Sequence, residues 1–310
     1  MRLVFCGTPQ FAVPSLEKLA AAGFDLRLVV TQPDRPQGRG MELTAPPVKQ
    51  AALRFGLPVI QPEKIKKNEE FQKLLNDIAP EAIIVVGYGR IIPPWMLQLP
   101  PHGNINVHGS LLPKYRGAAP IQWAIARGES ITGVTTMRLD EGLDTGDILL
   151  QRELPILPQD TAITLSPRLA ELGADLLVET LNGLKQKTIH AIPQNHAEAT
   201  LAPILKKEDG LIDFHRTAIE IHNRLRGFQP WPGAYTQFRG KNLKIIAAQP
   251  AQEDLPIAAG ELRVRHDRLI VGCGAGTVLE LLQVQLEGKK AFSAREFING
   301  YRIAEGEPLG

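Results

Sequence analysis

The segment Glu81-Ala82-Ile83-Ile84-Val85-Val86-Gly87 (EAIIVVG) holds five consecutive apolar residues between a glutamate and a glycine. A short apolar run bounded in this way is typical of a strand that is buried on both faces of a sheet. Strand-like runs alternate with helical patterns here, with strands predicted at 3–6, 26–31 and 82–86 and helices at 15–22, 48–55 and 71–78. This alternation predicts an α/β domain with a mostly parallel sheet, because parallel strands need long crossover connections.

The same pattern continues to about residue 187 and then changes. Further strands are predicted at 105–108, 132–139 and 147–154, and further helices at 120–126 and 161–184. Residues 188–205 lose any clear period and are predicted to be a linker. After a helix at 218–226, short alternating runs at 243–247, 260–264, 269–271 and 279–284 favour a small β-barrel. The predicted domains are therefore residues 1–187 and 206–310.

Composition narrows the class of protein. The chain has 310 residues, 44% hydrophobic and 22% charged, as is usual for a soluble globular protein, and no apolar stretch approaches the length of a membrane span. Cys6 and Cys273 lie far apart, so neither a disulfide framework nor a cysteine metal site is expected, and a cytoplasmic location fits. With 35 basic and 33 acidic residues, the net charge of +2 does not itself indicate a nucleic-acid partner.

The first predicted strand is followed by Gly7-Thr8-Pro9-Gln10-Phe11-Ala12, where a dinucleotide fingerprint would lie. The segment lacks the second glycine that lets the backbone approach a pyrophosphate, and no suitably placed acidic residue follows the next strand. It is predicted to be a tight turn between strand and helix, and NAD is not expected.

Two polar residues close the predicted strand at 105–108. Side chains two positions apart on a strand point the same way, so Asn106 and His108 share a face at the strand's carboxyl end, where ligands bind in open α/β sheets. An imidazole there can relay protons near neutral pH, and a carboxamide can donate to an oxygen that develops negative charge. The alternative is that Asn106 and His108 are buried residues whose polar atoms form hydrogen bonds with backbone groups.

The stretch after His108 and the later segment 140–147 extend this candidate site. Pro113 prevents the strand from continuing, and Lys114 and Arg116 place cations either beside a pocket for an anionic ligand or on a solvated turn. Residues 140–147 carry four carboxylates and two glycines but lack the EF-hand pattern, so no metal site is expected. A carboxylate from this loop can instead orient and charge-stabilise an imidazole.

Taken together, INVHGSLLPKYRGAAPIQWAI (105–125) and LDEGLDTGDIL (139–149) resemble the signature of the folate-dependent formyltransferases. The resemblance extends nearly end to end through six further segments: FCGTPQFAVPSL, TQPDRPQGRG, VVGYGRIIP, ILKKEDGLIDF, RGFQPWPGAYT and LEGKKAFSAREFING. It is greatest to the members of the family that formylate methionyl initiator tRNA. The resemblance implies a Rossmann-like domain that binds 10-formyltetrahydrofolate and an OB-like barrel that helps to hold tRNA. It also implies a monomer.

The same resemblance assigns roles to residues. The catalytic trio would be Asn106, His108 and Asp144. Folate would contact eight residues: Ser110, Leu111, Leu112, Pro113, Gly87, Tyr88, Gly89 and Arg90. The loop 34–44 resembles the insertion that engages the acceptor arm of initiator tRNA.

Four basic residues are predicted to contact tRNA: Arg35 and Arg39 in that loop, and Lys206 and Lys207 at the start of the second domain. The loop departs from the expected pattern, because Met41 and Glu42 stand where further lysines would favour phosphate binding. Without the resemblance, a surface excursion rich in proline and glycine would be the simpler interpretation of the loop.

Two alternative functions stay open at this point. The trio does not identify the amine that receives the formyl group, so an amino-sugar nucleotide or glycinamide ribonucleotide could be the acceptor. A non-catalytic RNA-binding protein with a degenerate α/β domain is the alternative from another class. The presence of Asn106, His108 and Asp144 speaks against it.

Overall fold

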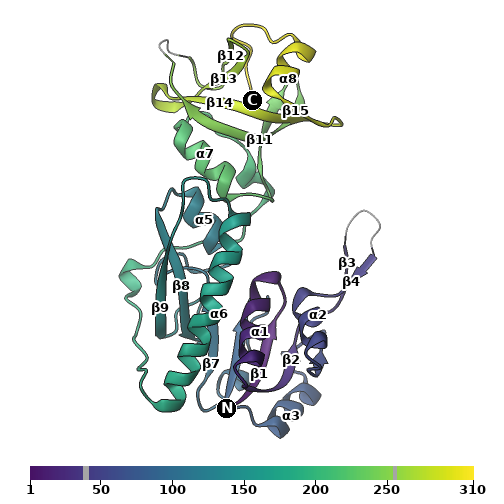
Figure 1. The fold of residues 1–310 in the computed structure, drawn as a ribbon, viewed down its shortest axis with the longest axis vertical. Coiled ribbons are helices and arrows are strands. Elements are labelled where there is room, and N and C mark those ends of the chain that lie inside the picture. Colours follow the sequence, from purple (N-terminus) through teal and green to yellow (C-terminus); the bar gives the residue numbers. More distant parts are fainter. Residues whose placement is uncertain (38–41, 254–256) are drawn as a thin grey trace. The chain divides into compact units, whose positions relative to one another are not determined.

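The computed structural model describes residues 1–37, 42–253 and 257–310 (Figure 1). The chain forms two compact units. One contains Met1–Pro120, Ile131–Pro155 and Ser166–Ala202, and the other contains Ile121–Ser130, Ile156–Leu165 and Pro203–Gly310. Within the described ranges, no helix combines the length and apolar character that crossing a membrane requires.

The first unit is built on a seven-stranded sheet with the order β5-β2-β1-β6-β7-β8-β9. The strands are β1 (Arg2–Gly7), β2 (Asp25–Val30), β5 (Val59–Ile60), β6 (Ala82–Val86), β7 (Asn104–His108), β8 (Ile131–Arg138) and β9 (Ile148–Pro155). From β5 to β7 all neighbours are parallel, whereas β8 and β9 join antiparallel. The predicted fold class, with a mostly parallel Rossmann-like sheet, is confirmed.

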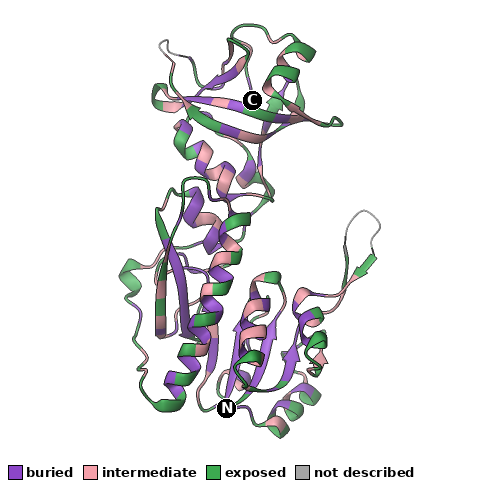
Figure 2. Cartoon of the chain, in the orientation of Figure 1, coloured by how far each residue is buried: buried purple, intermediate pink, exposed green. Residues whose placement is uncertain are grey.

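Strand β6 lies at the centre of this sheet and is buried along its whole length. Figure 2 shows that the neighbouring strands β1 and β7 are also largely buried. Ile84 and Val86 pack on one face against α1, α2 and α6, while Ile83 and Val85 pack on the other against α3 and α4. The helices are α1 (Val13–Ala21), α2 (Pro47–Arg54), α3 (Glu69–Ile78), α4 (Pro94–Leu97) and α6 (Ala162–Gln186). Burial on both faces explains why EAIIVVG carries no polar residue inside its apolar run.

The predicted loop 34–44 contains a short antiparallel hairpin of β3 (Arg35–Gln37) and β4 (Glu42–Thr44), in which Arg35 lies opposite Thr44. Sequence reasoning did not predict these strands, because Pro36 removes a ladder donor and the segment has no apolar alternation. The predicted tRNA contact Arg39 lies outside the described residues.

The second unit contains a six-stranded antiparallel sheet of the order β10-β11-β14-β13-β12, with β15 also paired to β14. The strands are β10 (Ala234–Phe238), β11 (Lys241–Ala251), β12 (Leu262–Arg265), β13 (Arg268–Gly272), β14 (Val278–Leu286) and β15 (Ala291–Ser293). Strand β14 pairs with β11 along one edge and with β13 and then β15 along the other. This arrangement agrees with the small β domain predicted from the sequence.

Helices complete the second unit: α5 (Pro120–Ala126), α7 (Ala218–Gly227) and α8 (Ala294–Tyr301). Phe297 of α8 is fully buried beside Phe238 and Tyr301, with ring centroids 5.1 and 4.7 Å away. The core of this unit is therefore separate from that of the α/β sheet, and both units have a substantial apolar interior.

Much of the segment predicted as a linker packs on the first unit. Ile192 forms a backbone bridge with Ile148, and Leu201 forms one with Arg116. A short 3-10 turn occupies His196–Glu198 within this segment, and another, at Lys207–Gly210, follows it. The predicted domain limits at 187 and 206 stay a prediction, but residues as far as Ala202 cluster with the α/β unit.

Candidate active site

Strand β7 delivers Asn106 and His108 to the same side of the sheet. Asn106 pairs with Val85 of β6 and Met137 of β8, and His108 at the strand end pairs with Thr135. His108 is only 6% exposed, whereas Asn106 is half-buried. Within the described part of the chain, the Asn106 carboxamide makes no hydrogen bond, so its N–H groups are available to a ligand.

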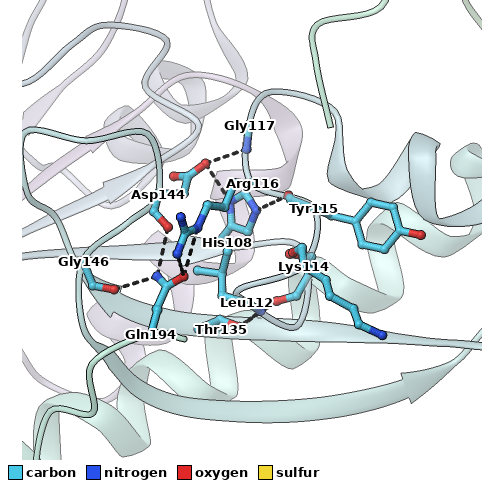
Figure 3. Close-up of polar contacts among 11 residues, drawn as sticks. His108, Leu112, Lys114, Tyr115, Arg116, Gly117, Thr135, Asp144, Gly146 and Gln194 are labelled. Atoms are coloured by element: carbon cyan, nitrogen blue, oxygen red, sulfur yellow. Dashed lines mark hydrogen bonds and ion pairs between the residues drawn. The ribbon is translucent and has the colours of Figure 1, made fainter. Parts of the chain in front are cut away.

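The His108 imidazole lies between two acceptors (Figure 3). Its Nε2 is 2.9 Å from the carbonyl oxygen of Tyr115, and its Nδ1 is 3.7 Å from Oδ2 of Asp144. A neutral imidazole carries one N–H, whereas the imidazolium carries two. The Asp144 carboxylate therefore lies at ion-pair distance, where it compensates the positive charge of the ring when the ring is protonated.

Asp144 occupies a turn that holds its carboxylate toward His108. Its φ of +51° is in the left-handed region, which few residues other than glycine adopt. Its Oδ2 accepts a hydrogen bond of 2.8 Å from the backbone N–H of Gly117. Gly146 lies so close to Arg138 that a Cβ would come within 1.9 Å of the Arg138 carbonyl oxygen, so the turn requires a glycine there.

Sequence reasoning missed two residues that support this turn. Gln194 donates from Nε2 to the carbonyl oxygens of Asp144 (2.9 Å) and Gly146 (2.7 Å), and its Oε1 accepts from the guanidinium of Arg116. Gln194 falls in the segment predicted as a linker, where no periodicity marked it. Arg116 was noted only as a cation of the loop.

The predicted folate loop is fastened to β8 and β9. The hydroxyl of Thr135 donates to the carbonyl of Ser110 (2.7 Å) and accepts from the backbone N–H of Leu112 (3.1 Å). Gln151 donates to the Leu112 carbonyl (2.8 Å) and to the Thr135 hydroxyl (3.0 Å). Ser110 and Leu112 are buried, while Leu111 and Pro113 are partly exposed. The peptide bond between Leu112 and Pro113 is cis.

The second predicted folate segment follows β6. Gly87 and Gly89 have positive φ, of 55° and 77°, and are exposed. The Tyr88 carbonyl accepts from Thr8 and Gln32, each at 3.1 Å. The Tyr88 side chain points into the core, and burial raises the pKa of its phenol. This segment therefore offers a ligand its backbone and Arg90.

An open groove of about 1010 Å³ lies beside this second segment. Its lining includes Arg90, Ile91, Trp95 and three lysines, Lys64, Lys66 and Lys67. Arg90 is the only predicted folate residue in this lining, and none of the trio contributes to it. The groove is therefore next to the predicted folate segment rather than at the His108–Asp144 pair.

The predicted tRNA contacts that the structure describes are surface residues. Arg35 is exposed on β3, and Lys206 and Lys207 are exposed at the start of the second unit's main segment. Neither lysine ammonium forms an ion pair with a described residue.

Two family profiles match the chain. The family described as Formyl transferase matches residues 1–181, and Formyl transferase, C-terminal domain, matches residues 204–302. The chain is 68% identical to the methionyl-tRNA formyltransferase of Koribacter versatilis over 310 residues, which cover 100% of this chain and 99% of that protein. It is 60% identical over 310 residues to the methionyl-tRNA formyltransferase of Acidobacterium capsulatum, with 100% of both chains covered.

A solved structure shares the fold. The N-formyltransferase of Helicobacter canadensis, in complex with folinic acid and dTDP-3-aminofucose, has a TM-score of 0.67 and 22% sequence identity. The match covers 90% of this chain and 98% of that one. At this identity the similarity concerns the fold alone.

Proposed function

The chain belongs to the methionyl-tRNA formyltransferases, and we propose that it carries out formyl transfer with Asn106, His108 and Asp144 as its catalytic trio. The formyl donor in this proposal is 10-formyltetrahydrofolate, and the acceptor is the α-amine of methionine esterified to initiator tRNA. The folinic acid held by the Helicobacter canadensis protein supports a folate as the co-substrate.

The chemistry needs no nucleophile from the protein. The substrate amine attacks the formyl carbon, so a new C–N bond forms and the carbonyl oxygen becomes an oxyanion. When this tetrahedral intermediate collapses, the bond from the formyl carbon to N10 breaks. The amine loses a proton and N10 gains one, giving N-formylmethionyl-tRNA and tetrahydrofolate.

The single observation that carries the proposal is the placement of His108 between the Asp144 carboxylate and the Tyr115 carbonyl. When protonated, the imidazole held there places a compensated positive charge beside the Asn106 carboxamide on the same strand face. Both groups would stabilise the developing oxyanion, which is where preorganised donors contribute most to catalysis. Because Nε2 is bonded to Tyr115, proton transfer through that nitrogen requires the bond to open first.

The remaining assignments complete the proposal. Folate would lie against two segments, Ser110 to Pro113 and Gly87 to Arg90, and the exposed glycines leave room for a ligand to approach the backbone. The acceptor arm of the tRNA would contact Arg35 and Arg39, and Lys206 and Lys207 would also contact the tRNA. We further propose that the protein acts as a cytoplasmic monomer.

One acceptor assay tests this function. Purified protein with 10-formyltetrahydrofolate is offered initiator methionyl-tRNA, elongator methionyl-tRNA, an amino-sugar nucleotide or glycinamide ribonucleotide, and release of tetrahydrofolate is followed. We expect fast release with initiator methionyl-tRNA alone. Preference for a small amine would contradict the proposed acceptor, and no release with any acceptor would support a non-catalytic RNA-binding protein.

A further inference from the structure

We propose that Gln194, backed by Arg116, is a positioning residue that fixes the Asp144 turn for catalysis. The proposal rests on the proposed function, because it gives Gln194 its effect through Asp144. Gln194 is 6% exposed and Arg116 is 7% exposed, so both polar side chains are buried. Their contacts with Asp144 and Gly146 are drawn in Figure 3.

The hydrogen-bonding groups admit only one orientation of the Gln194 amide. Its Oε1 lies 2.6 Å from Nη2 and 3.1 Å from Nε of Arg116, and a guanidinium can only donate. Its Nε2 faces the carbonyl oxygens of Asp144 and Gly146, which can only accept. A flipped amide would place its N–H groups against the Arg116 guanidinium and its oxygen against the two carbonyls. Arg116 therefore fixes the orientation in which the Gln194 Nε2 donates to the turn.

The network also accounts for the burial of Arg116. Within the described part of the chain, its guanidinium has no carboxylate partner, and it bonds Gln194 Oε1 and His196 Nδ1 instead. A buried cation is costly unless its donors are satisfied. A donor that is ionised forms stronger hydrogen bonds, and chains of such bonds polarise one another, so the cation strengthens the donation from Gln194 to the turn.

These contacts close a ring around the strained residue. Asp144 has its carboxylate held by the N–H of Gly117 and its carbonyl held by Gln194, and Gln194 is held by Arg116, the neighbour of Gly117. A left-handed aspartate persists only where its surroundings determine its conformation. If the two hydrogen bonds from Gln194 Nε2 are lost, the turn can relax and the Asp144 carboxylate no longer faces His108 Nδ1.

The variant Gln194→Glu isolates this function. It keeps the size of the side chain and the contact with Arg116, but it removes both N–H donations and sets a carboxylate against two carbonyls. We expect kcat to fall about 10- to 100-fold, since displacement of a catalytic group by an ångström has effects of that order. The KM values for folate and for methionyl-tRNA should stay within about twofold of the wild type, as the positioning role requires.

Two companion proteins make the result decisive. Gln186→Glu adds the same charge at an exposed position at the end of α6 and should keep the wild-type kcat. Gln194→Met keeps packing without hydrogen bonds and should reproduce the loss if Gln194→Glu does not fold, as judged by circular dichroism. A wild-type kcat in the folded Gln194 variant would overturn the proposal.

A double-variant cycle tests whether Gln194 acts through Asp144. In an Asp144→Asn background, Gln194→Glu should reduce kcat by less than about twofold further, because residues that act as a unit are not additive. Full additivity would overturn the proposal. If Asp144→Asn alone kept the wild-type kcat, the proposed role of Asp144 would fail instead, which distinguishes the two failures.

Discussion

The contact between His108 and the Asp144 carboxylate is the feature on which turnover should depend. His108→Ala removes the ring that, when protonated, carries positive charge beside the oxyanion, and Asp144→Asn removes the carboxylate that compensates this charge. We expect the single-turnover formylation rate to fall by about 10²- to 10⁴-fold in each, the range typical of a positioned acid or base. Circular dichroism and folate binding should be unchanged. Near wild-type rates in both variants would contradict the assignment of this pair.

Asn106 offers a cleaner separation of catalysis from stability. Its carboxamide bonds no described residue, so Asn106→Ala removes no internal hydrogen bond and should leave the melting temperature nearly unchanged. Loss of one oxyanion donor typically reduces kcat by about 10²- to 10³-fold. The measurement is kcat alongside a thermal melt. Parallel loss of stability and kcat would indicate a structural role for Asn106 instead.

Among the elements, β8 holds the predicted folate loop through one hydroxyl. Thr135→Val keeps the shape of the side chain but leaves the buried N–H of Leu112 and carbonyl of Ser110 without their partner. Each unsatisfied buried group costs about 1–3 kcal/mol, so the free energy of unfolding should fall by at least about that amount. We also expect the variant to have a higher KM for folate than the wild type has. Urea unfolding and steady-state kinetics test both. Thr132→Val controls for the exchange itself, because Thr132 lies on the opposite face of β8 and its hydroxyl bonds no described residue.

Helix α7 packs on β11 through a histidine whose protonation should affect the second unit. Burial lowers the pKa of His222 below its usual 6.5, the hydrogen bond to the Ala248 carbonyl opposes this shift, and the charge of Arg226 adds to the lowering. The unfolded chain therefore binds this proton at higher pH than the folded chain. The contribution to stability is complete above about pH 6.5 and is lost as the pH falls through the lower folded pKa.

The variant His222→Gln keeps a hydrogen-bond donor but does not titrate. We expect its free energy of unfolding to fall less than that of the wild type between pH 7.5 and pH 5. Urea unfolding at several pH values provides the comparison. Parallel curves for the two proteins would contradict a role for His222 in the pH dependence.

The same elements show what the sequence could and could not predict. Strand β6 and helix α7 were predicted within one residue of their observed bounds, because burial imposes a clear period or an unbroken apolar run. Helix α8 was missed although Ser293 and Glu296 form a capping box, a signal that was present but unused. Gln194 could not be found in this way, because its contacts with Asp144 and Gly146 span about fifty residues and follow no period.

For the whole molecule, ion pairing changes how the basic residues of the second unit should be counted. The arginines on or beside its strands are paired with glutamates: Arg239 with Glu307, Arg263 and Arg265 with Glu305, and Arg268 with Glu280. Arg224 lies over the rings of Trp123 and Phe228, and Arg226 donates to the Asp160 carbonyl. A count of charges in the sequence treats all these cations alike, whereas the structure leaves Lys206 and Lys207 unpaired among the described residues.

Replacing Lys206 and Lys207 together by alanine should therefore weaken tRNA binding with little effect on folate. Each phosphate contact releases bound counterions. The slope of the logarithm of affinity against the logarithm of salt concentration, which is negative, should therefore become less steep by about one to two. The KM for folate should stay within about twofold of the wild type. A matched pair, Lys241→Ala with Lys244→Ala, removes the same charge from exposed positions on β11. Equal changes in salt slope for the two pairs would mean that only net charge matters, whereas a change confined to the first pair assigns phosphate contact to the segment that begins the second unit.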